Sequence, residues 1–299
     1  MLSSVKISAE LIRIYGCPTG IKRRKLWVFM GIIESIKKGF GVATKSRQLM
    51  LLLFGFGFIC NLVNVLLRNN VVLLTNQVQT LGVGAFIAII VLYSLFILLT
   101  IIFMEAGILA YVRDVVKDGQ SSLARFKEAG FKFYLRVLAI NFIVGLSIMV
   151  LFILAELIMK VLAGAPNILI LVVAMIFVVA VIVAVVFLSL TPYAAVADDL
   201  GVFDAFKTSI AVAKASFWKL FFTGLLLILV PFILRFIVES VIGHLSAILT
   251  GTPAQIVTGF MSSLLNAFFG IVGSGTFMTF YLANQGSSGS AGDSPPGTP

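Results

Sequence analysis

The sequence has little of the residue chemistry on which metal sites and disulfide scaffolds depend. Its 299 residues include two cysteines and one histidine. Cys17 precedes the first long apolar run and Cys60 lies inside it, so no structural disulfide is expected. A single histidine, His244, excludes a multi-histidine metal site. The sequence therefore predicts no metal centre and no other cofactor.

Charged residues are also scarce. Only 11% of the residues are charged, whereas 60% are hydrophobic, and a soluble globular domain carries about 25% charge. Six apolar runs reach the roughly 20 residues that a helix needs to cross a bilayer. They cover approximately residues 48–68, 84–112, 136–162, 168–192, 217–240 and 254–284. The expected fold class is therefore all-α, a polytopic membrane protein with six transmembrane helices.

Sequence motifs for catalysis are missing as well. No HExxH, GxSxG or Walker A pattern occurs, so the chain has no recognisable metalloprotease, hydrolase or nucleotide-binding signature. No cleavable signal peptide is apparent either, because the short run WVFMGII is followed by Glu34. The absence of these motifs also argues against a lipid-handling enzyme, which is a third possible function beside the two given below. We expect a protein that is not an enzyme.

The positive charges that are present lie on one side of the expected membrane. Ten Lys and Arg precede the first span, six lie in the second connection and three in the fourth, which is 19 of the 22. Cytoplasmic connections carry this excess of Lys and Arg. We therefore expect cytoplasmic N- and C-termini. No nucleic-acid module accompanies the net charge of +10, so no nucleic-acid partner is expected.

A short basic segment with helical periodicity precedes the first, third and fifth spans. The three segments begin SIKKGF, SSLARF and DAFKTS. Their apolar faces are expected to hold Ile36, Phe40 and Ala43 in the first, Leu123, Phe126, Gly130 and Phe133 in the second, and Phe206, Ile210, Ala213 and Phe217 in the third. Each segment is predicted to be an amphipathic helix at the membrane interface.

The even-numbered spans also end alike, with a tyrosine followed by a glycine. The sequences are YVRDVVKDG, YAAVADDLG and YLANQG, in which glycines 119, 201 and 286 are expected to stop the helix. The sequence therefore predicts a unit of one interfacial helix and one transmembrane hairpin. This unit occurs as three parallel repeats, at about 31–119, 120–201 and 202–285. A basic cytoplasmic segment, 1–30, precedes the membrane domain 31–285, and a flexible tail, 286–299, follows it.

The run VADDLGVFDAFKTSIAVAKASFWKLF resembles a recurring signature of a broad prokaryotic group of six-span membrane proteins. The matching residues are Asp198, Asp199, Gly201, Ala205, Phe206, Ser209, Phe217 and Trp218. The group includes the membrane domain attached to some glycerophosphodiester phosphodiesterases and several stand-alone families of unknown function. The resemblance implies a prokaryotic cytoplasmic membrane, and a membrane module that assists another component or acts on lipid. The phosphodiesterase catalytic domain has no counterpart in the sequence, so no catalytic residue is assigned.

The basic segments supply the candidate surface for lipid headgroups. Each Lys or Arg near an anionic membrane surface contributes about 1 kcal/mol of attraction. The predicted headgroup residues are Lys37, Lys38, Lys45, Arg47, Arg125, Lys127, Lys132, Lys207, Lys214 and Lys219. Anionic membrane lipids are therefore the first expected partner.

Ionisable residues inside the spans are the other candidates, because such residues are costly in lipid and often functional. They are Glu105, Glu156, Lys160, Arg235 and Glu239. Glu105 is interpreted either as a carboxyl group paired within the bundle or as a proton or cation site. The other four form i,i+4 pairs, which either neutralise themselves or join in a cluster. The polar side chains of residues 262, 263 and 266, and the glycines at 270, 273 and 275, indicate helix packing.

Two functions follow from these observations. The first is a non-enzymatic integral membrane scaffold or accessory subunit that engages anionic lipid headgroups or a membrane-complex partner. Such a partner would be a protein in the membrane or on the cytoplasmic face. The alternative is a transporter or channel for a small or amphiphilic solute, with Glu105 in the path. A polar cavity joining Glu105 to one surface would favour transport.

Overall fold

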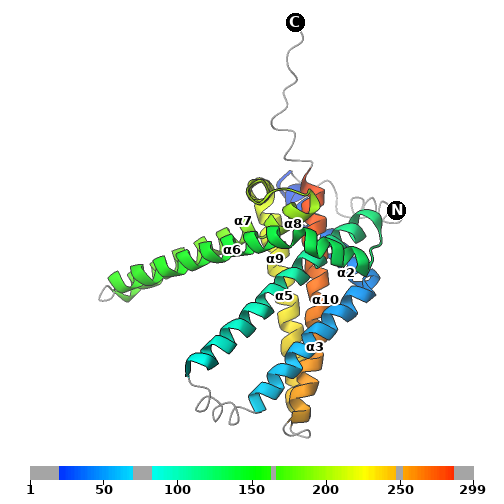
Figure 1. Cartoon of the computed structure of the whole chain (residues 1–299). Helices are drawn as coiled ribbons and strands as arrows, with labels where there is room; N and C mark the ends of the chain where they lie inside the picture. Colours follow the sequence, from blue (N-terminus) through cyan, green and yellow to red (C-terminus); the bar gives the residue numbers. More distant parts are fainter. Residues whose placement is uncertain (1–19, 70–82, 163–165, 247–251, 286–299) are drawn as a thin grey trace.

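The computed structural model describes residues 20–69, 83–162, 166–246 and 252–285, and this part of the chain contains no β-strand (Figure 1). The helices are α2 (Gly20–Lys45), α3 (Arg47–Asn69), α5 (Val83–Asp118), α6 (Leu123–Val161), α7 (Asn167–Leu188), α8 (Thr191–Ala197), α9 (Val202–Ser246) and α10 (Thr252–Asn284). The all-α prediction is confirmed. The tail 286–299 and the first 19 residues lie outside the described residues.

Six helical segments are long and apolar enough to cross a membrane, as predicted. They are Arg47–Leu66, Ile87–Asp118, Leu123–Val161, Asn167–Ala197, Val202–Val241 and Thr252–Asn284. The sequence of α7, NILILVVAMIFVVAVIVAVVFL, explains why: it contains no charged residue over 22 positions. With its 45 residues, α9 is about 68 Å long, so it extends well beyond a hydrocarbon core of about 30 Å.

Two of the helical stretches are interrupted by a serine before they enter the apolar region. Ser46 separates α2 from α3, and Ser216 has non-helical backbone angles, φ −131° and ψ 28°, inside α9. The Ser216 hydroxyl donates to Asn284 Oδ1 at 3.1 Å, which ties the bend in α9 to the end of α10. In contrast, α6 runs from Leu123 to Val161 with no such break. The three-repeat arrangement therefore remains a prediction.

Most fully buried side chains lie toward one end of the helices. At this end the C-terminal parts of α5 and α10 meet α2, α8 and the N-terminal parts of α6 and α9 (Figure 1). We call it the basic end, and the end where α3 stops and α10 begins the opposite end. The main buried cluster includes Val42, Leu49, Tyr111, Val112, Ile140, Leu190, Val212, Leu220, Ile271, Met278 and Tyr281. The core therefore sits at the basic end.

The short helix α8 lies at the centre of this core. Thr191, Ala194, Ala195 and Val196 are each 0% exposed. All four side chains are smaller than leucine and lack flexible ends, so the surrounding helices approach α8 closely. The turn after α8 is thereby held between α5, α6 and α10, where its side chains meet theirs.

A second close approach joins α2 to α10 at two glycines. A Cβ atom added to Gly39 would clash with Thr276 Oγ1 and lie 2.6 Å from the Val272 carbonyl oxygen. A Cβ atom added to Gly275 would lie 3.1 Å from the Gly39 Cα. Gly39 leaves no room for a side chain and Gly275 leaves very little, so α2 packs directly on the backbone of α10.

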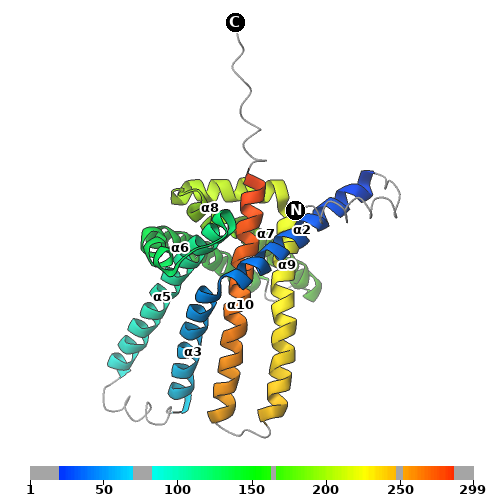
Figure 2. The ribbon, with the colours of Figure 1, turned by 90° about the vertical axis from the view of Figure 1, so that its right-hand side faces the viewer.

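The spans separate from one another away from the basic end. α10 lies between α3 and α9, and the three run side by side toward the opposite end (Figure 2). The α6–α7 hairpin instead leaves the bundle at a large angle (Figure 1). No residue of α7 is fully buried, and its main contacts within the described chain are with α9 and α6. Much of its apolar surface is therefore left exposed.

The predicted apolar faces are correct for one basic segment and displaced for two. In α6 the buried residues include Phe126, Gly130 and Phe133, as expected. In α2 and α9 the predicted aromatic residues remain partly or largely exposed, with Phe40 38% exposed. Ala43 and Ala213 of the predicted faces are buried as expected. The other buried positions include Ser35, Gly39 and Val42 in α2 and Ala205, Ser209, Val212 and Ser216 in α9. These helices cross others too closely for a phenylalanine ring.

Candidate functional site

The turn between α8 and α9 is the most densely bonded polar region of the basic end. Asp199 has a positive φ of 55°, whereas Gly201 does not. The prediction that Gly201 stops the helix is therefore wrong: Asp199 takes the left-handed conformation that follows a helix end. Gly201 begins α9 instead, since its carbonyl oxygen accepts from the Ala205 N–H at 2.9 Å. The expected stop at Gly119 is confirmed, with φ 81°, and residue 286 lies outside the described ranges.

Asp199 is held by two cations of α6. Lys132 Nζ lies 2.6 Å from Asp199 Oδ2, and Arg136 Nη1 pairs with Asp199 Oδ1. Lys132 and Arg136 are four residues apart on one helix face. The hydrogen bond from Lys132, and then that from Arg136, lowers the pKa of the Asp199 carboxyl group below its usual value. The ionised Asp199 carboxylate therefore links the turn to α6.

Asp198 faces the other way and connects the same turn to α10. Its Oδ2 atom accepts hydrogen bonds from the Tyr281 hydroxyl and, at 2.6 Å, from Gln285 Nε2. Tyr281 is 0% exposed, so this tyrosine of the sixth span anchors the core as well as lying near the membrane boundary. Two adjacent aspartates thus bind two different helices.

Cations of α5 satisfy the end of α8. Arg113 Nη1 donates to the Val196 carbonyl oxygen at 2.9 Å, and Lys117 Nζ donates to the Ala197 carbonyl oxygen at 3.2 Å. The last carbonyl groups of a helix lack partners within the helix and carry partial negative charge, so cations stabilise them. Arg113 also pairs with the buried Asp114 at 2.8 Å. Two carbonyl groups at the C-terminus of α8 thus accept from cations of α5.

One buried ring lies under three of these cations. The Phe133 ring centroid is 5.0 Å from Lys132 Nζ, 5.8 Å from the Arg136 guanidinium carbon and 5.9 Å from that of Arg113. Phe133 is only 1% exposed. The negative face of the ring attracts cations, which helps to hold α5, α6 and the α8–α9 turn in register.

The ten predicted headgroup residues divide into two groups. Four make ion pairs within the chain: Lys38 with Glu34, Arg125 with Asp114, Lys132 with Asp199, and Lys207 with Asp204. Within the ranges that the structure describes, the other six make no ion pair: Lys37, Lys45, Arg47, Lys127, Lys214 and Lys219. Of these six, five are exposed and Lys219 is half-buried. The second group is the free basic surface.

Each of the predicted intramembrane residues bonds to a partner side chain. Glu105 Oε2 accepts from Asn141 Nδ2 at 2.6 Å, which joins α5 to α6. Glu156 and Lys160 pair at 2.7 Å on α6, and Arg235 and Glu239 pair at 2.7 Å on α9. Among the described residues, no ion pair links α6 to α9 at these positions.

Of the cations in this region, the sequence predicted Arg125 and Lys132 as headgroup residues, whereas Arg113, Lys117 and Arg136 entered only the count of cytoplasmic charges. Asp198 and Asp199 belonged to the matched signature without a structural role, Asp114 received none, and Tyr281 was expected only as an interfacial tyrosine. The repeated pattern of a tyrosine followed by acidic residues near a span end was the available signal. In the described part of the chain, no group of three His, Cys, Asp or Glu lies together in a way that would hold a metal ion.

Residues 30–284 match the family described as Domain of unknown function (DUF7847). Because the match covers most of the chain, the protein belongs to this family. Searches of curated proteins and of solved structures found no match. The match agrees with the expected likeness to a family of unknown function, and nothing in it links the chain to the membrane domains of glycerophosphodiester phosphodiesterases.

Proposed function

We propose that this member of the DUF7847 family is a non-enzymatic integral membrane scaffold or accessory subunit. Its basic end would engage anionic lipid headgroups or a partner of the same charge within a membrane complex. The observation that carries the proposal is the division of charges at that end. Most acids there bond to other side chains of the protein, whereas six of the ten predicted headgroup cations make no ion pair within the described residues.

The internal bonds of the acids support a structural role for the α8–α9 turn. Asp198 and Asp199 accept from side chains of neighbouring helices. Asp114 pairs with Arg113 of its own helix and, at 3.6 Å, with Arg125 of α6. Asp118 and Glu128 are the exposed acids of α5 and α6 at this end without an ion pair within the described ranges. Removing acids from the surface in this way leaves a net positive face, which suits a headgroup of opposite charge.

The orientation of this face is part of the proposal. The excess of Lys and Arg favours a cytoplasmic basic end, with both termini on that side of a prokaryotic cytoplasmic membrane. We also retain the three parallel repeats as a hypothesis. The left-handed residues Gly119 and Asp199 after α5 and α8 support it, as do the breaks at Ser46 and Ser216. The likeness to phosphodiesterase membrane domains is also retained as a hypothesis.

Transport through Glu105 is the alternative, and its geometry favours it less. Glu105 is bonded to Asn141, and it lines neither of the two cavities described below. If Glu105 has only a structural role, Glu105→Gln should keep the fold, because glutamine keeps the oxygen that accepts from Asn141. Loss of a proton-driven flux in liposomes with an unchanged unfolding temperature would instead support the transporter.

The headgroup proposal is tested with lysines that share a helix but differ in pairing. Lys37→Gln combined with Lys214→Gln removes two unpaired cations, one from α2 and one from α9. Two cations at about 1 kcal/mol each correspond to roughly 30-fold weaker binding of anionic lipid. The measurement is the anionic lipid that co-purifies with the protein and its affinity for phosphatidylglycerol in nanodiscs.

The matched control is Lys38→Gln combined with Lys207→Gln, on the same two helices. Their charges are already neutralised by Glu34 and Asp204, so a smaller change in lipid content is expected. Equal lipid content in the wild type and both double variants would contradict headgroup binding. A protein partner predicts a further result: gentle solubilisation from native membrane should yield the chain with another protein in a defined ratio.

A further inference from the structure

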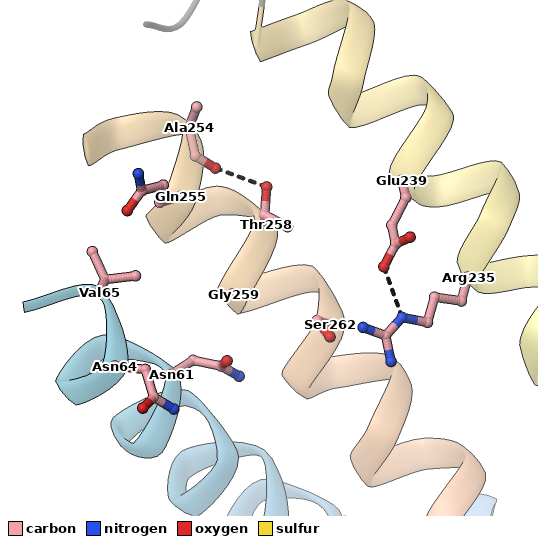
Figure 3. A pocket seen from close by; sticks show the side chains of 10 residues that line it. All are labelled: Asn61, Asn64, Val65, Arg235, Glu239, Ala254, Gln255, Thr258, Gly259 and Ser262. Atoms are coloured by element: carbon pink, nitrogen blue, oxygen red, sulfur yellow. Dashed lines mark hydrogen bonds and ion pairs between the residues drawn. The ribbon is translucent and has the colours of Figure 1, made fainter. Parts of the chain in front are cut away.

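A polar pocket opens at the opposite end of the bundle, far from the basic surface. It has a volume of about 420 Å³ and lies between α3, α9 and α10 (Figure 3). Its polar lining consists of Asn61, Asn64, Arg235, Glu239, Gln255, Thr258 and Ser262. The volume falls within the range of about 300–1,000 Å³ typical of small-molecule sites.

Several of these polar groups have unused bonding capacity. Arg235 Nε donates to Glu239 Oε1 at 2.7 Å. That bond leaves the terminal nitrogens of Arg235 and the second oxygen of Glu239 without a bond in the described part of the chain. The guanidinium group points toward Ser262 on α10 (Figure 3). The side chains of Asn64, Gln255 and Ser262 make no hydrogen bond to another described residue. The pocket therefore offers a cationic edge, an anionic edge and neutral hydrogen-bonding groups together.

A second, less polar cavity adjoins the first. It has a volume of about 230 Å³ and shares Arg235 and Ser262 with the polar pocket. Its other lining residues are Pro231, Phe232, Leu265, Asn266 and Phe269. Pro231 lies four residues closer to the basic end than Arg235, which is about 6 Å along α9. The apolar cavity thus lies on the membrane-interior side of the polar one.

The depth of the polar pocket matches the far boundary of a bilayer. Nineteen residues separate Ser216, where α9 bends, from Arg235, which is about 28 Å of helix. Fifteen residues separate Ser46 from Asn61, which is about 22 Å. A hydrocarbon core is about 30 Å thick. The polar pocket therefore lies near one headgroup layer, while the adjoining cavity faces the acyl chains of that leaflet.

We propose that these two cavities together form a binding site for one zwitterionic phospholipid. Its phosphate group would lie on the terminal nitrogens of Arg235, and its ammonium group on the free oxygen of Glu239. An acyl chain would follow the cavity lined by Pro231 and Phe269. A neutral ion pair matches a headgroup with no net charge, in contrast to the free cations of the basic end.

The test compares phosphatidylethanolamine with phosphatidylglycerol of identical acyl chains. Arg235→Gln combined with Glu239→Gln should reduce retained phosphatidylethanolamine about tenfold or more, as expected on losing bonds to charged groups. The control, Glu156→Gln combined with Lys160→Gln, removes another i,i+4 pair, also of 2.7 Å. That pair lines neither cavity, so retention should be unchanged. Lipid bound to the purified protein in mild detergent is measured by native mass spectrometry.

A second variant keeps the test decisive if the first one does not fold. Ser262→Phe places a ring where the two cavities meet and should exclude the lipid while both charges remain. Soluble glycerophosphoethanolamine is the third arm, because it carries the same headgroup without acyl chains. It should bind at least tenfold more weakly than the lipid. Equal binding of both would overturn the lipid assignment, and equal retention of phosphatidylethanolamine by all variants would overturn the site.

Discussion

The two ends of the bundle are built on different principles. At the basic end, small side chains lie between closely crossing helices, and polar groups bond to one another across α5, α6, α8 and α10. At the opposite end the helices separate, and Ile228, Phe232 and Phe236 of α9 are each more than 60% exposed. In lipid, large apolar side chains gain nothing by turning inward, whereas small ones permit close backbone contact. The basic end therefore fixes the fold, and the opposite end provides space.

The largest effect should come from filling the closest crossing at the basic end. Gly39→Ala places a methyl group against Thr276 and the Val272 carbonyl oxygen. Thr276 has little freedom to move, since its hydroxyl donates to the same oxygen at 2.7 Å. Overpacking of this kind destabilises by about 3 kcal/mol, measured by denaturant unfolding in micelles.

Gly41→Ala is the matched control for this change. A Cβ atom there would meet no heavy atom within 4 Å, and alanine favours a helix by about 1 kcal/mol over glycine. It should therefore leave stability unchanged or slightly increase it. If both variants behaved alike, α2 would not be packed on α10 as described.

The second effect in size concerns Asp198. Tyr281→Phe removes one of its two hydrogen bonds, both made to a charged group. We expect a loss of about 2 kcal/mol in the free energy of unfolding. Tyr93→Phe, on an exposed tyrosine of α5, should change stability by much less. Equal effects of the two substitutions would argue that the Asp198 contact contributes nothing specific.

A smaller effect, below about 1 kcal/mol, is expected for the exposed pairs of Asp199. Because its pKa is lowered in the folded protein from 3.8, their contribution is fully present above pH 3.8. It disappears as the pH falls through the lowered pKa. The stability difference between the wild type and Asp199→Asn should therefore shrink below that pH. A difference that is constant from pH 6 to pH 3 would contradict this account.

The smallest effect is expected at the opposite end. Asn61 Nδ2 donates to Ser263 Oγ at 2.8 Å between α3 and α10. Interhelical hydrogen bonds of this type contribute about 0.6 kcal/mol on average in a membrane. Asn61→Leu should therefore lower the free energy of unfolding only slightly, as measured by denaturant unfolding in micelles. A loss as large as that of Tyr281→Phe would remove the difference between the two ends.

Much of the fold could be predicted because it depends on local properties of the sequence. Span number follows from the length of the apolar runs. The α6 face was predicted correctly since Gly130 lies within its apolar spacing. In α2 and α9 the helical spacing placed Phe40 and Phe206 on the apolar face together with Ala43 and Ala213, but only the two alanines are buried. In a membrane, close packing favours Gly39 and Ala205 instead.

The candidate sites were predictable only as separate residues. The cations of the basic end could be named from composition and position. Their acid partners could not, since Lys132 and Asp199 are 67 residues apart in the chain. The same limit applies to the opposite end. Arg235 was named as an intramembrane charge, but the amide of Asn64 lies on a different helix, and only the tertiary structure brings the two together.

The contact between Gly39 and Gly275 also has a consequence for the timing of biosynthesis. The two glycines are 236 positions apart, and chains grow at about 5–20 residues per second. We therefore expect α2 to exist for roughly 10–50 s before the surface that it packs on has been synthesised. During this interval the membrane interface is the environment that suits its basic and apolar faces. The first helix of the domain would then be among the last to reach its final position.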